Sequence, residues 1–179
     1  AVQLRYVAQM ISGGLQTKIY IVNINGFDTH DSQIEDPGTP AVGIHANLLK
    51  SVSDAVAAFQ DDLNLLGLEQ RVAGMTFSEF GRQVAANASL GTDHGDAAPL
   101  FLFGTCISSQ IIGPNPVISD QIVDQAGIPM QIDFRDVYAS VLKDWFQADP
   151  TDIQAMFEHT VNFIPVLDSC NLGINENKL

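Results

Sequence analysis

A strand-like run, a long amphipathic helix and a second strand-like run follow one another in the first half of the sequence. Residues 18–24, "KIYIVNI", are almost continuously apolar and β-branched, which is typical of a strand buried on both faces of a parallel sheet. Apolar residues between 44 and 66 recur every three or four positions and predict a helix, and residues 71–77, "RVAGMTF", predict the next strand. Such a crossover joins parallel neighbours. The order therefore predicts a doubly wound α/β fold, with a mostly parallel sheet and helices on both faces.

Other segments complete the expected organisation. We expect one further strand over 99–104, and helices over 2–14, over 134–146 behind an Asp133 cap, and over 150–158 behind an Asp149 cap. Residues 1–165 would then be part of one α/β domain, and residues 166–179 an extended tail or linker. With 179 residues, of which 46% are hydrophobic, the chain is long enough to bury one such core.

Charge and cysteine content narrow the classes of partner. The sequence has 21 acidic and 8 basic residues, and its formal charge of -13 repels nucleic acid and anionic lipid. No apolar stretch reaches the roughly 18 residues that a transmembrane helix needs, and the first residues do not resemble a signal peptide, so an export signal would have to precede residue 1. Cys106 and Cys170 do not form a CxxC motif. They could form one long-loop disulfide or remain two buried thiols.

Two clusters of acids and histidines stand where predicted strands end or begin. Asp28 and His30 follow the first strand two positions apart, so both side chains point to the same side of an extended backbone. Asp93 and His94 are adjacent and precede the third strand. A carboxylate and an imidazole together suit Zn²⁺ or Mn²⁺, and two such clusters look like a dinuclear site. The plainer interpretation of Asp28 and His30 is a polar turn that hydrogen-bonds nearby amides.

Four other residues could take part in chemistry. Glu79 could be a metal ligand or could orient a histidine, and Arg82 could hold an anion or form a salt bridge. Ser78 could be a nucleophile, although its surroundings lack the G-x-S-x-G pattern. His45 could be a third ligand or a solvated residue at the start of a helix. The sequence contains no glycine-rich phosphate loop, so we expect no nucleotide cofactor.

The sequence contains the series "GFDTHD", "H..LL", "AF..DL", "SEFGR", "N.S.GTDHG", "P.FLFG" and "D.R.VYASVL..W". In this series it resembles a bacterial exported family, domain of unknown function 1501, from its start to about residue 148. That family is placed in the alkaline phosphatase and sulfatase superfamily, so the resemblance implies two divalent cations at the carboxyl edge of the sheet. Asp28 and His30 would bind one ion, and Asp93 and His94 the other. Zn²⁺ or Mn²⁺ are expected, with Mg²⁺ or Ca²⁺ as alternatives.

The resemblance also implies an activity. We expect a metal-dependent hydrolase that acts on a small anionic phosphate or sulfate ester, with Arg82 holding the anion and Glu79 assisting. The superfamily's nucleophile comes early in the domain, so it would lie in an N-terminal remainder of the same protein. His159 lies roughly where the superfamily supplies a late histidine. A third interpretation, a serine hydrolase using Ser78, would need His94 within hydrogen-bond reach.

The tail suggests a location, and a second function is also open. "GINENKL" resembles the linker that enters the C-terminal sorting domain of proteins exported by the type IX secretion system of Bacteroidetes. We therefore expect an extracellular or cell-surface protein, with the periplasm as second choice. The alternative function is a noncatalytic scaffold or binding component of a secreted or cell-surface assembly, in contact with other such proteins.

Overall fold

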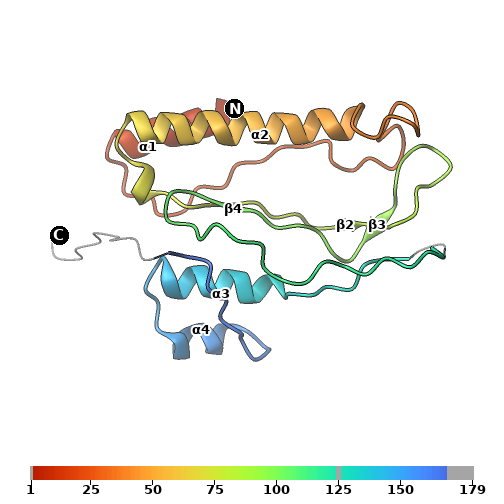
Figure 1. Cartoon of the computed structure of the whole chain (residues 1–179). Helices are drawn as coiled ribbons and strands as arrows, with labels where there is room; N and C mark the ends of the chain where they lie inside the picture. The colour runs from red at the N-terminus through yellow and green to blue at the C-terminus, as the bar shows by residue number, and fades with distance from the viewer. Residues whose placement is uncertain (1, 124–125, 169–179) are drawn as a thin grey trace. The chain divides into compact units, whose positions relative to one another are not determined.

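The computed structural model describes residues 2–123 and 126–168, which divide into two compact units (Figure 1). The first unit comprises Ala1–Glu69, Ser78–Pro99 and Val117–Pro129, and the second comprises Gln70–Phe77, Leu100–Pro116 and Met130–Leu179. A short 3₁₀ helix, η1 (Glu69–Arg71), lies where the chain first passes from one unit to the other. Each unit is described by itself below.

Two helices form the framework of the first unit. Helix α1 (Val2–Ser12) packs against α2 (Ile44–Leu65), and the expectation of helices over 2–14 and 44–66 is confirmed. Phe59 and Leu63 are the buried residues of α2. The helix stops because Gly67, with φ at 65°, adopts a left-handed conformation that few other residues tolerate.

The expected first strand is wrong. Residues 18–24 form no strand in the described part of the chain, and Ile19 and Ile21 are 65% and 77% exposed. One side chain reaches the segment: the Gln3 amide accepts from the Asn23 N–H at 2.9 Å and donates to the Asn23 carbonyl at 3.1 Å. β-branched composition favours a pleated conformation, but a strand forms only where a second strand pairs with it.

The doubly wound, mostly parallel sheet is therefore also wrong. The described strands make two short antiparallel pairs, β1 (Gly74–Met75) with β4 (Leu102–Phe103) in the second unit, and β2 (Gly81–Arg82) with β3 (His94–Gly95) in the first. Both pairs join segments on either side of residues 83–93. The chain thus doubles back on itself here, which gives antiparallel pairing, whereas parallel pairing needs a longer crossover.

Two further helices belong to the second unit, and both predicted caps are confirmed. Helix α3 (Phe134–Asp144) begins where the Asp133 carboxylate accepts from the Arg135 backbone N–H at 2.9 Å. Helix α4 (Pro150–Met156) begins in the same way behind Asp149, with proline in its first turn. Hydrogen bonds from Arg135 lower the pKa of Asp133 to about 2.

A buried carboxylate ties the segment after α4 to α3. The Asp136 side chain accepts from the Asn162 backbone N–H at 3.0 Å and pairs with Nε2 of His159 at 2.9 Å. One turn further on, the hydroxyl of Ser140 accepts from the N–H of Ile164 at 2.8 Å. His159 therefore lies on Asp136 within the second unit.

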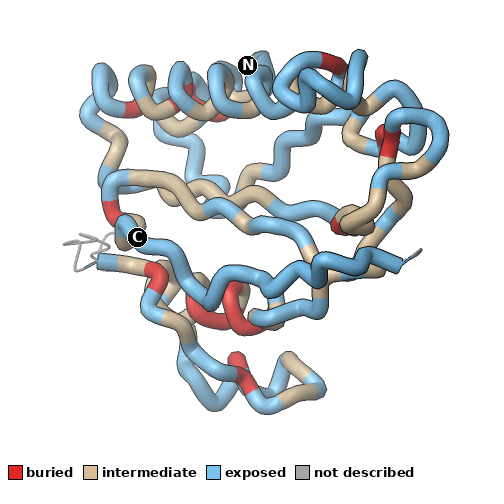
Figure 2. The backbone as a smooth tube through the Cα atoms, turned by 45° about the vertical axis from the view of Figure 1, so that its right-hand side comes forward, coloured by how far each residue is buried: buried red, intermediate tan, exposed pale blue. Residues whose placement is uncertain are grey.

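Buried positions are few along the described chain. Figure 2 shows them as short stretches between longer exposed ones. Cys106 is 1% exposed and is not a free thiol, while its predicted partner, Cys170, lies outside the described residues. None of the described helices has both the length and the apolarity needed to cross a membrane.

The stability of the first unit should depend on Leu63. Leu63→Ala should lower the free energy of unfolding by about 2–5 kcal/mol, because it leaves a cavity at a side chain that is 0% exposed. Leu65→Ala, in the same helix, is the matched control, since Leu65 is 84% exposed. Urea denaturation followed by circular dichroism measures both. Equal effects of the two substitutions would contradict this packing.

The pH dependence of the second unit should reflect Asp136. Burial raises the pKa of Asp136, but the Asn162 N–H and His159 more than offset this, so its pKa lies below 3.8. The stabilisation is therefore present above pH 3.8 and is lost as the pH falls through the folded-state pKa. Asp136→Asn should cost about 1–3 kcal/mol near neutral pH and speed amide exchange at Asn162. Glu158→Gln, at an exposed position, should change neither.

Candidate metal centre

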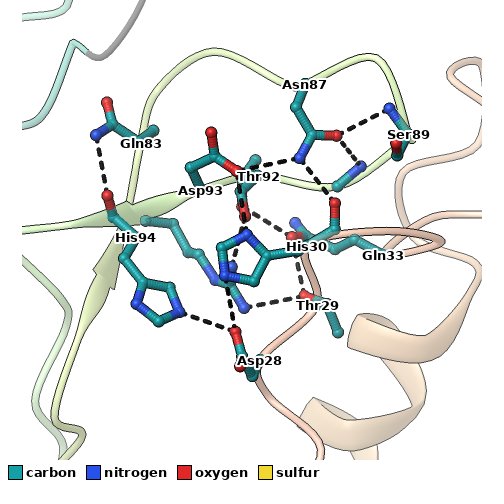
Figure 3. Close-up of polar contacts among 12 residues, drawn as sticks. Asp28, Thr29, His30, Gln33, Gln83, Asn87, Ser89, Thr92, Asp93 and His94 are labelled. Carbon is teal, nitrogen blue, oxygen red and sulfur yellow. Dashed lines mark hydrogen bonds and ion pairs between the residues drawn. The ribbon is translucent and has the colours of Figure 1, made fainter.

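Two loops of the first unit meet at the candidate site (Figure 3). The first loop, residues 27–33, follows the exposed apolar run, and the second loop, residues 87–94, leads into β3. The pairing of β2 with β3 places Arg82 directly opposite His94. This register brings the Arg82 side chain to the place where the two loops come together.

The guanidinium of Arg82 joins the two loops. Its Nη2 donates to the carbonyl of Phe27 and, at 3.2 Å, to the hydroxyl of Thr29. Its Nη1 donates to the carbonyl of Thr92 at 2.5 Å. A planar fork with several fixed donors can reach acceptors on both loops at once, which a lysine ammonium on a flexible stem does less well.

Gln33 and Gly91 hold the loops close. The side-chain oxygen Oε1 of Gln33 accepts from the hydroxyls of Thr29 at 3.0 Å and Thr92 at 2.8 Å, one from each loop. At Gly91, an added Cβ would lie 2.2 Å from the carbonyl oxygen of His30. Only glycine permits this approach of one backbone to the other.

Three side chains from the two loops converge on one point. Nε2 of His30 lies 3.1 Å from Oδ1 of Asp28, and Nε2 of His94 lies 2.8 Å from the same oxygen. The ligand atoms of these three residues all lie within 4.8 Å of one another, so together they could hold a metal ion. Their side chains are 61%, 48% and 45% exposed for Asp28, His30 and His94, so the cluster is open to solvent.

The ionised carboxylate of Asp28 suits a cation. The side-chain hydrogen bond with His94 lowers the pKa of Asp28, with smaller contributions from the charges of His30 and Arg82, so this carboxylate is ionised at neutral pH. A neutral imidazole nitrogen without hydrogen and a carboxylate oxygen both present lone pairs and repel each other at these distances. A proton on each imidazole, or one cation among the three atoms, removes that repulsion. The donor set therefore fits a divalent cation.

Asp93 lies next to the cluster. Its Oδ1 is 3.1 Å from Nδ1 of His30, the ring nitrogen that faces away from Asp28. The side-chain amide of Asn87 donates to the same oxygen at 3.3 Å and to the carbonyl of His30 at 2.7 Å. Of the predicted ligands Asp28, His30, Asp93 and His94, three converge on one point and Asp93 contacts one of them.

The other predicted residues lie around the cluster or apart from it. His45 packs edge-on against Phe27 with ring centroids 5.8 Å apart, and burial lowers its pKa. Glu79 is exposed and makes no hydrogen bond with any described residue. The Ser78 hydroxyl donates to the carbonyl of Phe80 at 2.9 Å, and no hydrogen bond joins it to His94 within residues 2–123. That geometry does not favour a serine hydrolase.

Several residues that hold the site were not singled out from the sequence. These are Thr29, Gln33, Phe80, Asn87 and Thr92. Phe80 stacks on the His94 ring with centroids 3.9 Å apart. The spacing of Asn87 and Ser89 is the one available sequence signal, because an asparagine that accepts from the backbone two residues on is typical of a turn.

Comparison with protein families identifies the family of the chain. A family model described as "Protein of unknown function (DUF1501)" matches residues 10–157. The chain belongs to the DUF1501 family. The DUF1501 match includes both loops and Arg82, and it confirms the family that the motifs predicted. No curated protein and no solved structure matches the chain.

Loss of the Arg82 fork should loosen both loops together. Arg82→Lys keeps the charge but cannot reach Phe27, Thr29 and Thr92 at once, so stability should fall by about 1–3 kcal/mol. Amide exchange should quicken at Gln33, whose N–H donates to the carbonyl of Leu90 at 2.9 Å. Arg5→Lys, in α1, is the control. Unchanged exchange at Gln33 in Arg82→Lys would show that the loops are held by other contacts.

Proposed function

We propose that this chain binds a divalent cation through Asp28, His30 and His94 and serves in the hydrolysis of phosphate or sulfate esters. The observation that supports the proposal is the approach of two imidazole nitrogens, at 3.1 and 2.8 Å, to one carboxylate oxygen. The three residues come from two loops far apart in the sequence, and Arg82 and Gln33 hold these loops together.

The ligand types set the choice of ion. One carboxylate and two imidazoles suit Zn²⁺ or Mn²⁺ better than Mg²⁺ or Ca²⁺, which prefer oxygen ligands. Three protein ligands leave coordination positions for water or substrate, as in catalytic zinc sites. A bound divalent cation would supply Lewis-acid polarisation of an ester oxygen and a lowered pKa of bound water. The resemblance to the alkaline phosphatase superfamily implies a second ion at Asp93 and His94; the present proposal needs only the first.

The charges of nearby residues would affect the binding of an anionic ester. The formal charge of -13 repels an anion from most of the surface, so local positive charge at the site is needed. Arg82 contributes a positive charge next to the cluster, although three of its hydrogen bonds hold the loops. Its part in the reaction would then be to position the ligands, with a weaker role in holding the anion. Glu79 is exposed and could accept a proton from solvent or substrate.

We also propose that the protein is exported. The tail resembles a linker to a type IX sorting domain, and Cys106 is not a free thiol, which suits an oxidising compartment. The chain would then act outside the cytoplasm, at the cell surface or in the extracellular medium.

One observation favours the noncatalytic alternative. The apolar run that precedes the site is exposed, with Ile19, Ile21 and Ile24 at 65%, 77% and 47%. Contiguous exposed apolar side chains often mark protein interaction sites. In that case the chain would be a binding component of a secreted or surface assembly, with or without a bound cation.

Cation binding and hydrolysis can be tested together. The full-length protein that contains this chain, purified without chelators, should contain Zn²⁺ or Mn²⁺ by elemental analysis and should cleave p-nitrophenyl phosphate or p-nitrophenyl sulfate. Asp28→Asn and His94→Ala should lose the ion and fall to the rate of the chelator-treated protein, because each removes a ligand. Asp31→Asn is the matched control, since it removes an exposed carboxylate beside the site.

The outcomes separate the two functions. A bound ion without cleavage of either ester would favour the noncatalytic binding component. Absence of a bound ion, together with no uptake of added Zn²⁺ or Mn²⁺, would contradict the proposed site itself.

A further inference from the structure

We propose that Asp93 is a positioning residue that orients His30 towards the cation, so that the cluster holds one ion and not two. This inference rests on the proposed cation site and concerns the residues that support it. It departs from the pairing of Asp93 and His94 as joint ligands of a second ion.

The two ring nitrogens of His30 face two different carboxylates. Nε2 faces Asp28 at 3.1 Å, and Nδ1 faces Asp93 at 3.1 Å. When the lone pair of Nε2 binds a cation between His30 and Asp28, the hydrogen of the neutral imidazole is on Nδ1. An ionised carboxylate has no hydrogen to give, so this Nδ1–H then donates to Asp93. The contact with Asp93 therefore stabilises the orientation and tautomer of His30 that bind a cation.

Asn87 fixes Asp93 relative to His30. Its side-chain amide donates to Oδ1 of Asp93 at 3.3 Å and to the His30 carbonyl at 2.7 Å. Its oxygen accepts from the backbone N–H groups of Ser89 at 2.9 Å and Gly91 at 3.1 Å, which holds the amide in place. The N–H of Gln83 donates to the Asp93 carbonyl at 2.9 Å, so the backbone of Asp93 is held as well. Asn87 and Gln83 thus hold Asp93 against the ring of His30.

Both expected ligands of a second ion make contacts within the cluster. Figure 3 shows the side chains of Asp93 and His94 leaving the backbone in different directions. His94 is directed at Asp28 through Nε2, at 2.8 Å, and its ring stacks on Phe80. Oδ1 of Asp93 is engaged with His30 and Asn87. Asp93 and His94 are adjacent in the sequence but have different roles. His94 is a ligand, whereas Asp93 acts through another ligand, His30.

The number of bound ions tests the role of Asp93. The cation-free full chain is titrated with Zn²⁺ by calorimetry and compared with Asp93→Asn, which keeps the shape of the side chain. We expect one Zn²⁺ per chain in both proteins, with affinity about 10–100-fold weaker in Asp93→Asn. Asp31→Asn should bind as the unsubstituted chain does. Two Zn²⁺ per chain, falling to one in Asp93→Asn, would overturn the proposal.

A second readout does not depend on the ion. Crystal structures of the cation-free chain and of Asp93→Asn show whether Asp93 holds the ring of His30. We expect Nδ1 of His30 to face Asp93 in the unsubstituted chain, and the ring to turn or lose its single orientation in Asp93→Asn, whose amide can donate as well as accept. An unchanged ring in Asp93→Asn would overturn the positioning role. Failure to bind Zn²⁺ would overturn the proposed function, while the orientation of the ring would still decide what Asp93 does.

Discussion

The contacts of one guanidinium hold the candidate site together. Arg82 donates to acceptors on the loop that carries Asp28 and His30 and on the loop that carries His94. Neither loop belongs to a helix or a long strand, so the usual means of fixing a ligand set on rigid elements are lacking. The guanidinium of Arg82 fixes the two loops instead, because hydrogen bonds from a charged group are stronger than those between neutral groups.

The helices could be predicted from the sequence, and the sheet could not. The stripe from Ile44 to Leu63 and the caps at Asp133 and Asp149 are local signals, and a helix makes its backbone hydrogen bonds within its own segment. The run over 18–24 has the composition of a buried strand, but its state depends on a partner elsewhere in space. Composition cannot show whether that partner is present, and in the described residues the run is exposed and unpaired.

The candidate ligands were predictable by type, but their division of labour was not. Asp28, His30 and His94 stand out because carboxylates and imidazoles bind cations, whichever fold presents them. The separation of Asp93 from His94 depends on where β3 begins and on the side chain of Asn87, neither of which spacing reveals. Arg82 was recognised as a cation that could meet an anion, whereas its partners are backbone carbonyls and a threonine hydroxyl.

The close approach of Gly91 to His30 has a consequence for motion. The backbones of the two loops touch, and Gln33 and Arg82 each bond to both, so neither loop can leave its place without breaking contacts of the other. Segments linked in this way open as one cooperative unit. Residues 27–33 and 87–94 would then share a single opening free energy, although more than fifty positions of the chain separate them.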